Sequence, residues 1–202
     1  MEFLDRYKAN NNNDYYKIYD KNGKYLKDIN IAEEKSLTDE YLYGVTCFVI
    51  NEKSEVLMEV RANTELTPGK IDLVSGHVNG GESGLNAVIR ELREEIGIIN
   101  DMPNRLYKVC SLAKPLGFES KGKIRNFFID FYCVLTRTEN VTLLQKSEVE
   151  ELKWIPLETA FEMIKQGKTK FPKQAGNVNY DQIFSNVRTI CLSREEQDFL
   201  TR

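Results

Sequence analysis

The chain of 202 residues contains one histidine, His77, and four cysteines that form no C-x-x-C pair. A histidine-rich metal site and catalysis by a pair of histidines are therefore excluded within one chain, and buried reduced thiols explain the scattered cysteines best. The sequence lacks a run of about 18 apolar residues that would cross a membrane, and its first residues lack the apolar core of a signal peptide. We therefore expect a cytoplasmic protein in which any metal is held mainly by oxygen atoms.

A large excess of charge of one sign is also missing. The chain has 28 Lys and Arg residues against 31 Asp and Glu residues, which gives a formal net charge of −3. A broad basic face for duplex nucleic acid is not expected from this balance, although it allows a small cationic pocket for one phosphate group. The hydrophobic fraction of 41% is typical of soluble globular proteins. The length predicts one compact domain with at most a small appendage.

The first 40 residues differ from the rest and are predicted to form an extension of a domain that spans residues 41–202. Within this extension, Asn22 and Gly23 stand between two runs of strand-forming residues. An Asn-Gly pair in this setting predicts a β-hairpin with a tight type I′ turn. We therefore expect an N-terminal β-hairpin that packs on the main domain.

From residue 41 the hydrophobic pattern alternates between strands and helices. Apolar and β-branched runs predict strands, and a period near 3.6 residues predicts helices. The expected strands are 41–50, 56–62, 70–76, 106–113, 126–136 and 151–157, and the expected helices are 83–96, 159–167 and a closing helix within 179–200. The sequence therefore predicts an α/β domain in which strands dominate.

Residues 83–96 show the clearest helical period in the chain. At about 100° per residue, five apolar side chains share one arc, which predicts the face that lies on the sheet. Gly97 follows at the position of a C-cap glycine. The five apolar residues are Leu85, Val88, Ile89, Leu92 and Ile96.

The same helix carries Glu91, Glu94 and Glu95 in its last two turns. Like charges three and four residues apart repel each other, and the C-terminal end of a helix favours cations. A sequence that breaks local rules in this way often serves a site, and a hard divalent cation is the partner that clustered carboxylates suit. Arg90 precedes Glu94 by four residues and could orient its carboxylate by an ion pair. On these residues alone, a solvated helix surface remains the alternative.

The segment Gly76–Ile98, GHVNGGESGLNAVIRELREEIGI, resembles the Nudix box, G-x5-E-x7-R-E-U-x-E-E-x-G-U, in which U is a bulky aliphatic residue. The downstream string SEVEELKWIPLETAFEMI is also similar to a Nudix segment in which an acidic loop precedes a Trp-bearing strand and a helix. Every fixed position of the box is filled, by Gly76, Glu82, Arg90, Glu91, Leu92, Glu94, Glu95, Gly97 and Ile98.

The resemblance implies an α/β/α sandwich on a mixed sheet, to which this chain adds the N-terminal hairpin. It implies Mg²⁺- or Mn²⁺-dependent hydrolysis of a nucleoside diphosphate linked to another moiety. The metal ions would neutralise the diphosphate and activate a bound water for attack on phosphorus. The resemblance implies that Glu91, Glu94 and Glu95 are metal ligands and that either Glu94 or Glu95 is also the base. Gly76 would offer a backbone carbonyl to the metal. Glu82 and Arg90 would brace the loop and the ligands.

Residues outside the box have weaker signals. Glu148 belongs to a second acidic patch, which in the family supplies a further metal ligand or the base, although these residues are equally well explained as solvated charges. Arg61 and Arg125 are candidates for contact with the substrate, with a surface cation as the alternative. The hairpin extension could cover the substrate pocket or pair two subunits, since homodimers are frequent in the family.

Two alternative functions stay open. The segment LMEVRANTELTPGKIDLVSGHV also resembles the branch of the family related to isopentenyl diphosphate isomerase. That isomerase needs a cysteine just before the box, where Val74 and Ser75 stand, and it departs from the full glutamate set that this chain retains. The third function is a non-catalytic Nudix-fold nucleotide-binding module, but the intact glutamates favour the hydrolase.

Overall fold

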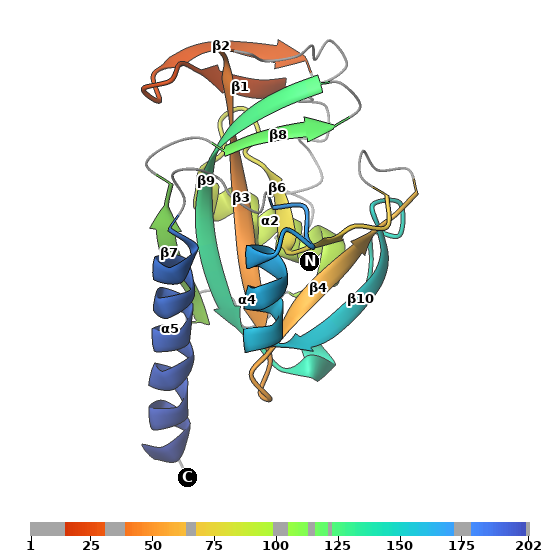
Figure 1. Cartoon of the computed structure of the whole chain (residues 1–202), viewed down its shortest axis with the longest axis vertical. Coiled ribbons are helices and arrows are strands. Elements are labelled where there is room, and N and C mark those ends of the chain that lie inside the picture. The colour runs from red at the N-terminus through yellow and green to blue at the C-terminus, as the bar shows by residue number, and fades with distance from the viewer. Residues whose placement is uncertain are drawn as a thin grey trace, which may run out of the picture.

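The computed structural model describes residues 15–30, 39–63, 68–98, 105–112, 116–120, 123–171 and 179–200. Within these residues, helices lie on both faces of a ten-stranded sheet (Figure 1). The strands are β1 (Tyr15–Tyr19), β2 (Tyr25–Asn30), β3 (Tyr41–Ile50), β4 (Glu55–Arg61), β5 (Ile71–Asp72), β6 (Val74–His77), β7 (Leu106–Ser111), β8 (Leu116–Ser120), β9 (Lys123–Leu135) and β10 (Val149–Pro156). The helices are α2 (Gly84–Ile96), α4 (Leu157–Lys165), α5 (Tyr180–Leu200) and the short 3₁₀ helix η2 (Thr138–Asn140).

The sheet is built around β3, and it is mixed as expected. β3 runs parallel to β9 over ten residue pairs, from Tyr41↔Asn126 to Ile50↔Leu135. β3 also pairs with β6 and β4, while β4 pairs with β5 and β10, all in the antiparallel sense. The strand pairing therefore places the start of the Nudix-like segment, on β6, next to the long central strand.

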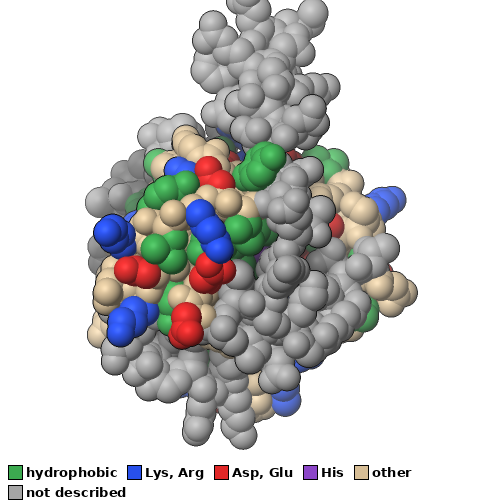
Figure 2. All heavy atoms as spheres, turned by 90° about the horizontal axis from the view of Figure 1, so that it is seen from above, with side chains coloured by type: hydrophobic (Ala, Val, Ile, Leu, Met, Phe, Trp, Pro, Cys, Tyr) green, Lys and Arg blue, Asp and Glu red, His purple; other side chains and the backbone are tan. Residues whose placement is uncertain are grey.

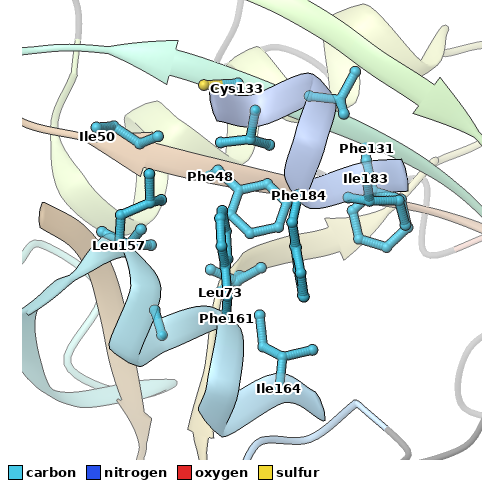
Figure 3. Packing of buried hydrophobic residues seen from close by; sticks show 14 of the residues in the cluster. Phe48, Ile50, Leu73, Phe131, Cys133, Leu157, Phe161, Ile164, Ile183 and Phe184 are labelled. Carbon is cyan, nitrogen blue, oxygen red and sulfur yellow. The ribbon is translucent and has the colours of Figure 1, made fainter. Parts of the chain in front are cut away.

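Each face of the sheet has its own hydrophobic core. On one face α4 and α5 pack against the sheet, and the rings of Phe161 and Phe184 stack with centroids 4.0 Å apart (Figure 3). Phe48 contributes from β3 beneath them. On the other face α2 packs through Val88 and Leu92. The α/β/α sandwich predicted from the resemblance is confirmed.

Helix α2 begins and ends where its sequence predicts. The Ser83 side chain accepts a hydrogen bond from the backbone N–H of Asn86, and Gly97 adopts a left-handed conformation with φ of 69°. The expectation that Leu85 lies on the buried face was wrong, because 49% of its surface is exposed. The first turn instead meets the sheet through Gly84, where an added methyl would lie 3.0 Å from Asp130 Oδ2. A side chain at this position would require Asp130 to shift, so glycine suits this close approach.

The N-terminal hairpin is present, but its turn is not type I′. Gly23 has a positive φ of 78°, whereas Asn22 does not belong to the positive-φ residues in the described part of the chain. Asp20 accepts the backbone N–H of Gly23, and its carboxylate accepts those of Asn22 and Lys24. This arrangement is a type I turn followed by a glycine bulge, and the Asp20 carboxylate favours it over the two-residue turn.

The hairpin belongs to the main sheet through the pairing of Tyr19 with Tyr41 on β3. Seen from this end of the molecule, apolar side chains lie between side chains of both charges (Figure 2). Exposed apolar residues of the hairpin include Tyr15, Tyr25 and Leu26. The boundary predicted at residue 40 therefore crosses a continuous sheet, and the division into extension and domain stays a prediction.

All four cysteines are free thiols. Cys47 and Cys133 are buried, as expected, and Cys110 and Cys191 are only partly buried. None of the helices in the described part of the chain has the length and apolar character that a membrane crossing requires.

Candidate active site

A cleft of about 250 Å³ opens beside β6 and the C-terminal half of α2. Its lining comes from β1, β3, β4, β6, β9 and α2, from the segment before β10, and from residues that follow α4. Acidic side chains gather here, together with three cations, Arg61, Arg90 and Lys170. The carboxylates that line the cleft are Glu59, Glu91, Glu94, Glu95 and Glu148.

The three clustered glutamates of α2 differ in exposure. Glu91 and Glu95 are buried, with 8% and 4% of their surfaces exposed, because they lie on the same helix face as the buried apolar residues. Glu94 is largely open to solvent, because 47% of its side chain is exposed. The solvated-surface alternative therefore does not describe Glu91 and Glu95.

Arg90 connects the box loop to the glutamates. Its Nη1 donates to Glu91 Oε1 at 2.6 Å and to Glu94 Oε2 at 3.3 Å, and its Nη2 donates to the His77 carbonyl at 2.8 Å. The same guanidinium binds both carboxylate oxygens of Glu82, whose Oε2 also accepts the Asn79 N–H. The ion pair between Arg90 and Glu94 is thus present, and five hydrogen bonds fix the guanidinium.

Glu59 is a site residue that the sequence analysis missed. It lies on β4, is buried, and shares a side-chain hydrogen bond with Glu95. Burial is the main cause that raises the pKa of both carboxyls, and the charge of Asp72 raises the pKa of Glu59 further. The signal was an acidic residue inside the apolar strand VLMEV, since a charge at such a position needs a partner.

These carboxylates suit a hard cation. Glu59 Oε1 and Glu95 Oε2 are buried, and neither has a hydrogen-bond partner in the described part of the chain. Oxygen atoms that are desolvated and repel one another are the donors that Mg²⁺ or Mn²⁺ binds. Among the described residues, no three acidic, His or Cys side chains already converge in a formed metal centre, and Arg90 holds Glu91 and Glu94.

The remaining sequence candidates are placed as follows. Glu148 is exposed and lines the cleft, where its charge contributes to the raised pKa of Glu91 and Glu95. Arg61 also lines the cleft and pairs with buried Asp72. The backbone of Arg125 lies in β9 opposite Phe118, but its side chain is outside the described residues.

An aromatic stack stands in the same cleft. Tyr16 of the hairpin lies parallel to His77, with ring centroids 4.3 Å apart, and His77 in turn contacts Phe127 at 5.3 Å. The bridge between Tyr16 and Asn79 joins β1 to the box loop. The hairpin therefore contributes directly to the lining of the cleft.

Comparison with known proteins agrees with this geometry. The chain is 28% identical over 144 residues to Nudix hydrolase 3 and 26% identical over 162 residues to Nudix hydrolase 7, both of Arabidopsis thaliana. These matches cover 68% and 79% of the chain but only 18% and 51% of the two relatives, so the chain spans at most about half of their length. Isopentenyl-diphosphate Delta-isomerase 1 of Photorhabdus laumondii is 34% identical over 94 residues, which are 45% of this chain and 53% of that protein.

Solved structures share the fold. A MutT protein from Methanosarcina mazei Go1 is 26% identical, with a TM-score of 0.53, and the match covers 77% of this chain and 96% of that one. DR0079 from Deinococcus radiodurans has a TM-score of 0.62 at 16% identity, over 80% of this chain and 94% of that one. The family model of the NUDIX domain matches residues 40–175, more than half of the chain, and the chain therefore belongs to the NUDIX family.

Proposed function

We propose that the chain is a Nudix pyrophosphohydrolase that cleaves the diphosphate linkage of a nucleoside diphosphate joined to another moiety. The observation that carries this proposal is the burial of Glu59, Glu91 and Glu95 in one cleft. One carboxylate oxygen each of Glu59 and Glu95 has no hydrogen-bond partner in the described part of the chain. A protein keeps desolvated carboxylates of this kind together only if a cation or a reaction uses them.

The cofactor proposed is Mg²⁺ or Mn²⁺, held by Glu91, Glu94 and Glu95, with the Gly76 carbonyl as a further ligand. A divalent ion in this position supplies neutralisation of the diphosphate charge and a lowered pKa for a bound water. Glu59, which hydrogen-bonds Glu95, extends the donor set.

The chain's own residues have separate roles in this proposal. Arg90 and Glu82 fix the loop and the two glutamates that Arg90 touches. Glu94 or Glu95 takes the proton of the attacking water, and Glu148 is the further candidate from outside α2. Tyr16, His77 and Phe127 offer aromatic surface to the nucleoside.

The isomerase is the second candidate, and the 34% identity to an isopentenyl-diphosphate isomerase over 94 residues favours it. The residues before the box argue against it. Ser75, not cysteine, lines the cleft on β6, and its hydroxyl donates to Asp72 at 3.4 Å. A non-catalytic nucleotide-binding module is the third candidate, and the complete glutamate set argues against it.

A turnover screen tests the proposal. The panel contains ADP-ribose, dinucleoside polyphosphates, NADH, nucleotide sugars, nucleoside triphosphates and isopentenyl diphosphate, each assayed with Mg²⁺ and a coupled phosphatase, with isomer analysis for the last. We expect hydrolysis of at least one nucleotide by the wild type. Glu94→Gln should reduce it by about 100-fold or more, whereas Glu150→Gln, which changes an exposed glutamate outside the cleft, should not. Isomerisation without hydrolysis would favour the second candidate instead.

The hairpin has two proposed roles, as a cover of the substrate pocket and as a contact between two subunits. The position of Tyr16 in the cleft supports the first role. Sedimentation of the chain with and without residues 1–40 tests the second role, because an unchanged number of subunits per particle would exclude the homodimer contact. The cytoplasmic location stays a prediction.

A further inference from the structure

Two cations of the cleft converge on one buried carboxylate. Lys170 Nζ lies 3.3 Å and Arg61 Nη1 lies 3.5 Å from Oδ2 of Asp72, of which only 1% is exposed. The other oxygen, Oδ1, accepts the backbone N–H of Leu73. Asp72 is therefore fixed from the backbone side, while its second oxygen faces the two cations at the cleft.

The segment after α4 positions Lys170. Its backbone N–H donates to the Ile71 carbonyl at 3.0 Å, and its neighbour Thr169 forms a parallel bridge with Ile71. Thr169 and Phe171, on either side, are both buried, whereas a third of the Lys170 side chain is exposed. Because both neighbours are anchored, the backbone of Lys170 is fixed beside the cleft.

The charges of the cleft are arranged in two regions. Glu59 and Asp72 are direct cross-strand partners on β4 and β5, so Asp72 continues the row of buried carboxylates that includes Glu95. Glu59 hydrogen-bonds a glutamate, but Asp72 faces two cations. Lys170 and Arg61 both line the cleft and meet at Asp72, so a pair of cations stands at this end of the cleft, where an anionic group can contact it.

We propose that Lys170 and Arg61 bind the phosphoryl group of the substrate diphosphate that lies away from the metal-binding glutamates, and that Asp72 positions both cations. This assignment rests on the proposed function, since it concerns the substrate of the same cleft. It adds Lys170 and Asp72, which lie outside the Nudix box, to the residues that recognise the substrate. A diphosphate fits the two regions. One phosphoryl group would face the glutamates through the divalent metal ion, and the other would contact Lys170 and Arg61 directly.

The test is calorimetric titration of the full chain with methylenediphosphonate, an analogue of diphosphate in which a methylene group replaces the bridging oxygen and prevents hydrolysis, in the presence of Mg²⁺. Lys170→Met should weaken binding about ten- to hundredfold, the effect of losing a hydrogen bond to a charged group. Lys170→Arg should retain most of the affinity. Lys168→Met is the matched control, because Lys168 is exposed and does not line the cleft, and its affinity should equal that of the wild type.

The outcomes separate this proposal from the function itself. Equal binding by the wild type and Lys170→Met, with hydrolysis intact, would overturn the assignment of Lys170 alone. A wild type that neither binds methylenediphosphonate nor hydrolyses any substrate would overturn the proposed function and this assignment together.

The proposed positioning role of Asp72 is tested by a measurement that a purely structural role would not affect, namely the coupling between substitutions of Asp72 and Lys170. Asp72→Asn should weaken binding in the wild type, but it should have a smaller effect when Lys170 is already methionine, because one of the cations that it positions is absent. Thermal unfolding of each variant confirms that the chain is folded. Strictly additive losses in affinity would show that Asp72 does not act through Lys170 and would overturn its positioning role.

Discussion

The backbone of Gly76 lies directly against the carboxylate of Glu91, so that a methyl group on Gly76 would fall 1.8 Å from Glu91 Oε1. Gly76 has no positive φ, and the reason for glycine at this first position of the box is therefore space. Glu91 can turn into the cleft only because nothing projects from β6 at this point. The glycine and the glutamate, 15 positions apart in the sequence, form one structural unit.

Gly76→Ala should therefore act through Glu91. The new methyl displaces the carboxylate from the cleft, and we expect turnover to fall at least about 100-fold, as for loss of a catalytic carboxylate. The comparison is Gly80→Ala in the loop that follows β6, where the nearest heavy atom to an added methyl is 3.7 Å away. The measurement is the steady-state rate of both variants, and a Gly76→Ala enzyme as active as Gly80→Ala would show that Glu91 is not required.

Arg90→Lys should impair the site while it preserves the charge. Lysine cannot reproduce the fork that binds both oxygens of Glu82 and also reaches Glu91 and Glu94. We expect a reduced kcat and a weaker apparent affinity for Mg²⁺, because the ligand glutamates lose their common anchor. A magnesium titration of activity measures both quantities. If the titration curve of Arg90→Lys matches that of the wild type, then the guanidinium only serves the fold.

In the absence of metal, the free energy of unfolding should decrease as the pH rises from about 5 to about 8. Burial raises the pKa of Glu59 to about 8 and that of Glu91 to about 7, from an ordinary value of 4.5. The folded chain therefore binds more protons than the unfolded chain in this range, and its stability is lost as those protons dissociate. Urea unfolding with EDTA at several pH values measures this slope.

The matched variant for this pH effect is Glu59→Gln, which keeps the shape but cannot ionise. It should flatten the dependence on pH, and addition of Mg²⁺ to the wild type should do the same by stabilising the ionised carboxylates. A wild-type protein whose stability stays constant or increases between pH 5 and 8 would contradict the raised pKa values.

The site residues differ in how far the sequence predicts them. Glu82, Arg90, Glu91, Glu94 and Glu95 stand at fixed spacings on one loop and helix, so the local pattern is sufficient to place them together. Glu59, Asp72 and Lys170 reach the cleft through strand pairing and a bridge between distant segments. Pairing of this kind depends on the whole sheet, and no local periodicity of the sequence encodes it.

The fold shows the same division. Helix caps and apolar runs predicted α2 and most strands, because capping and burial are local effects. The strand β8, Leu116–Ser120, was missed, since its five residues contain only two apolar side chains and a glycine, and its pairing with β9 defines it. The exposure of Leu85 was missed for another reason. The first turn of α2 meets the sheet through Gly84, which lies close to Asp130 and Tyr132. The helical period of the sequence contains no information about this approach.

Leu92 and Leu85 give a direct test of the face that α2 buries. Leu92 is fully buried in the core beneath the helix, whereas Leu85 is about half exposed. Leu92→Ala should therefore reduce the free energy of unfolding by about 2 to 5 kcal/mol, the range for a core leucine. Leu85→Ala, the same chemical change on the same helix, should change it by no more than about 0.5 kcal/mol, as for a surface substitution. Urea denaturation of the two variants at one pH and one metal concentration makes the comparison, and equal losses of stability would mean that α2 packs on the sheet in a different orientation.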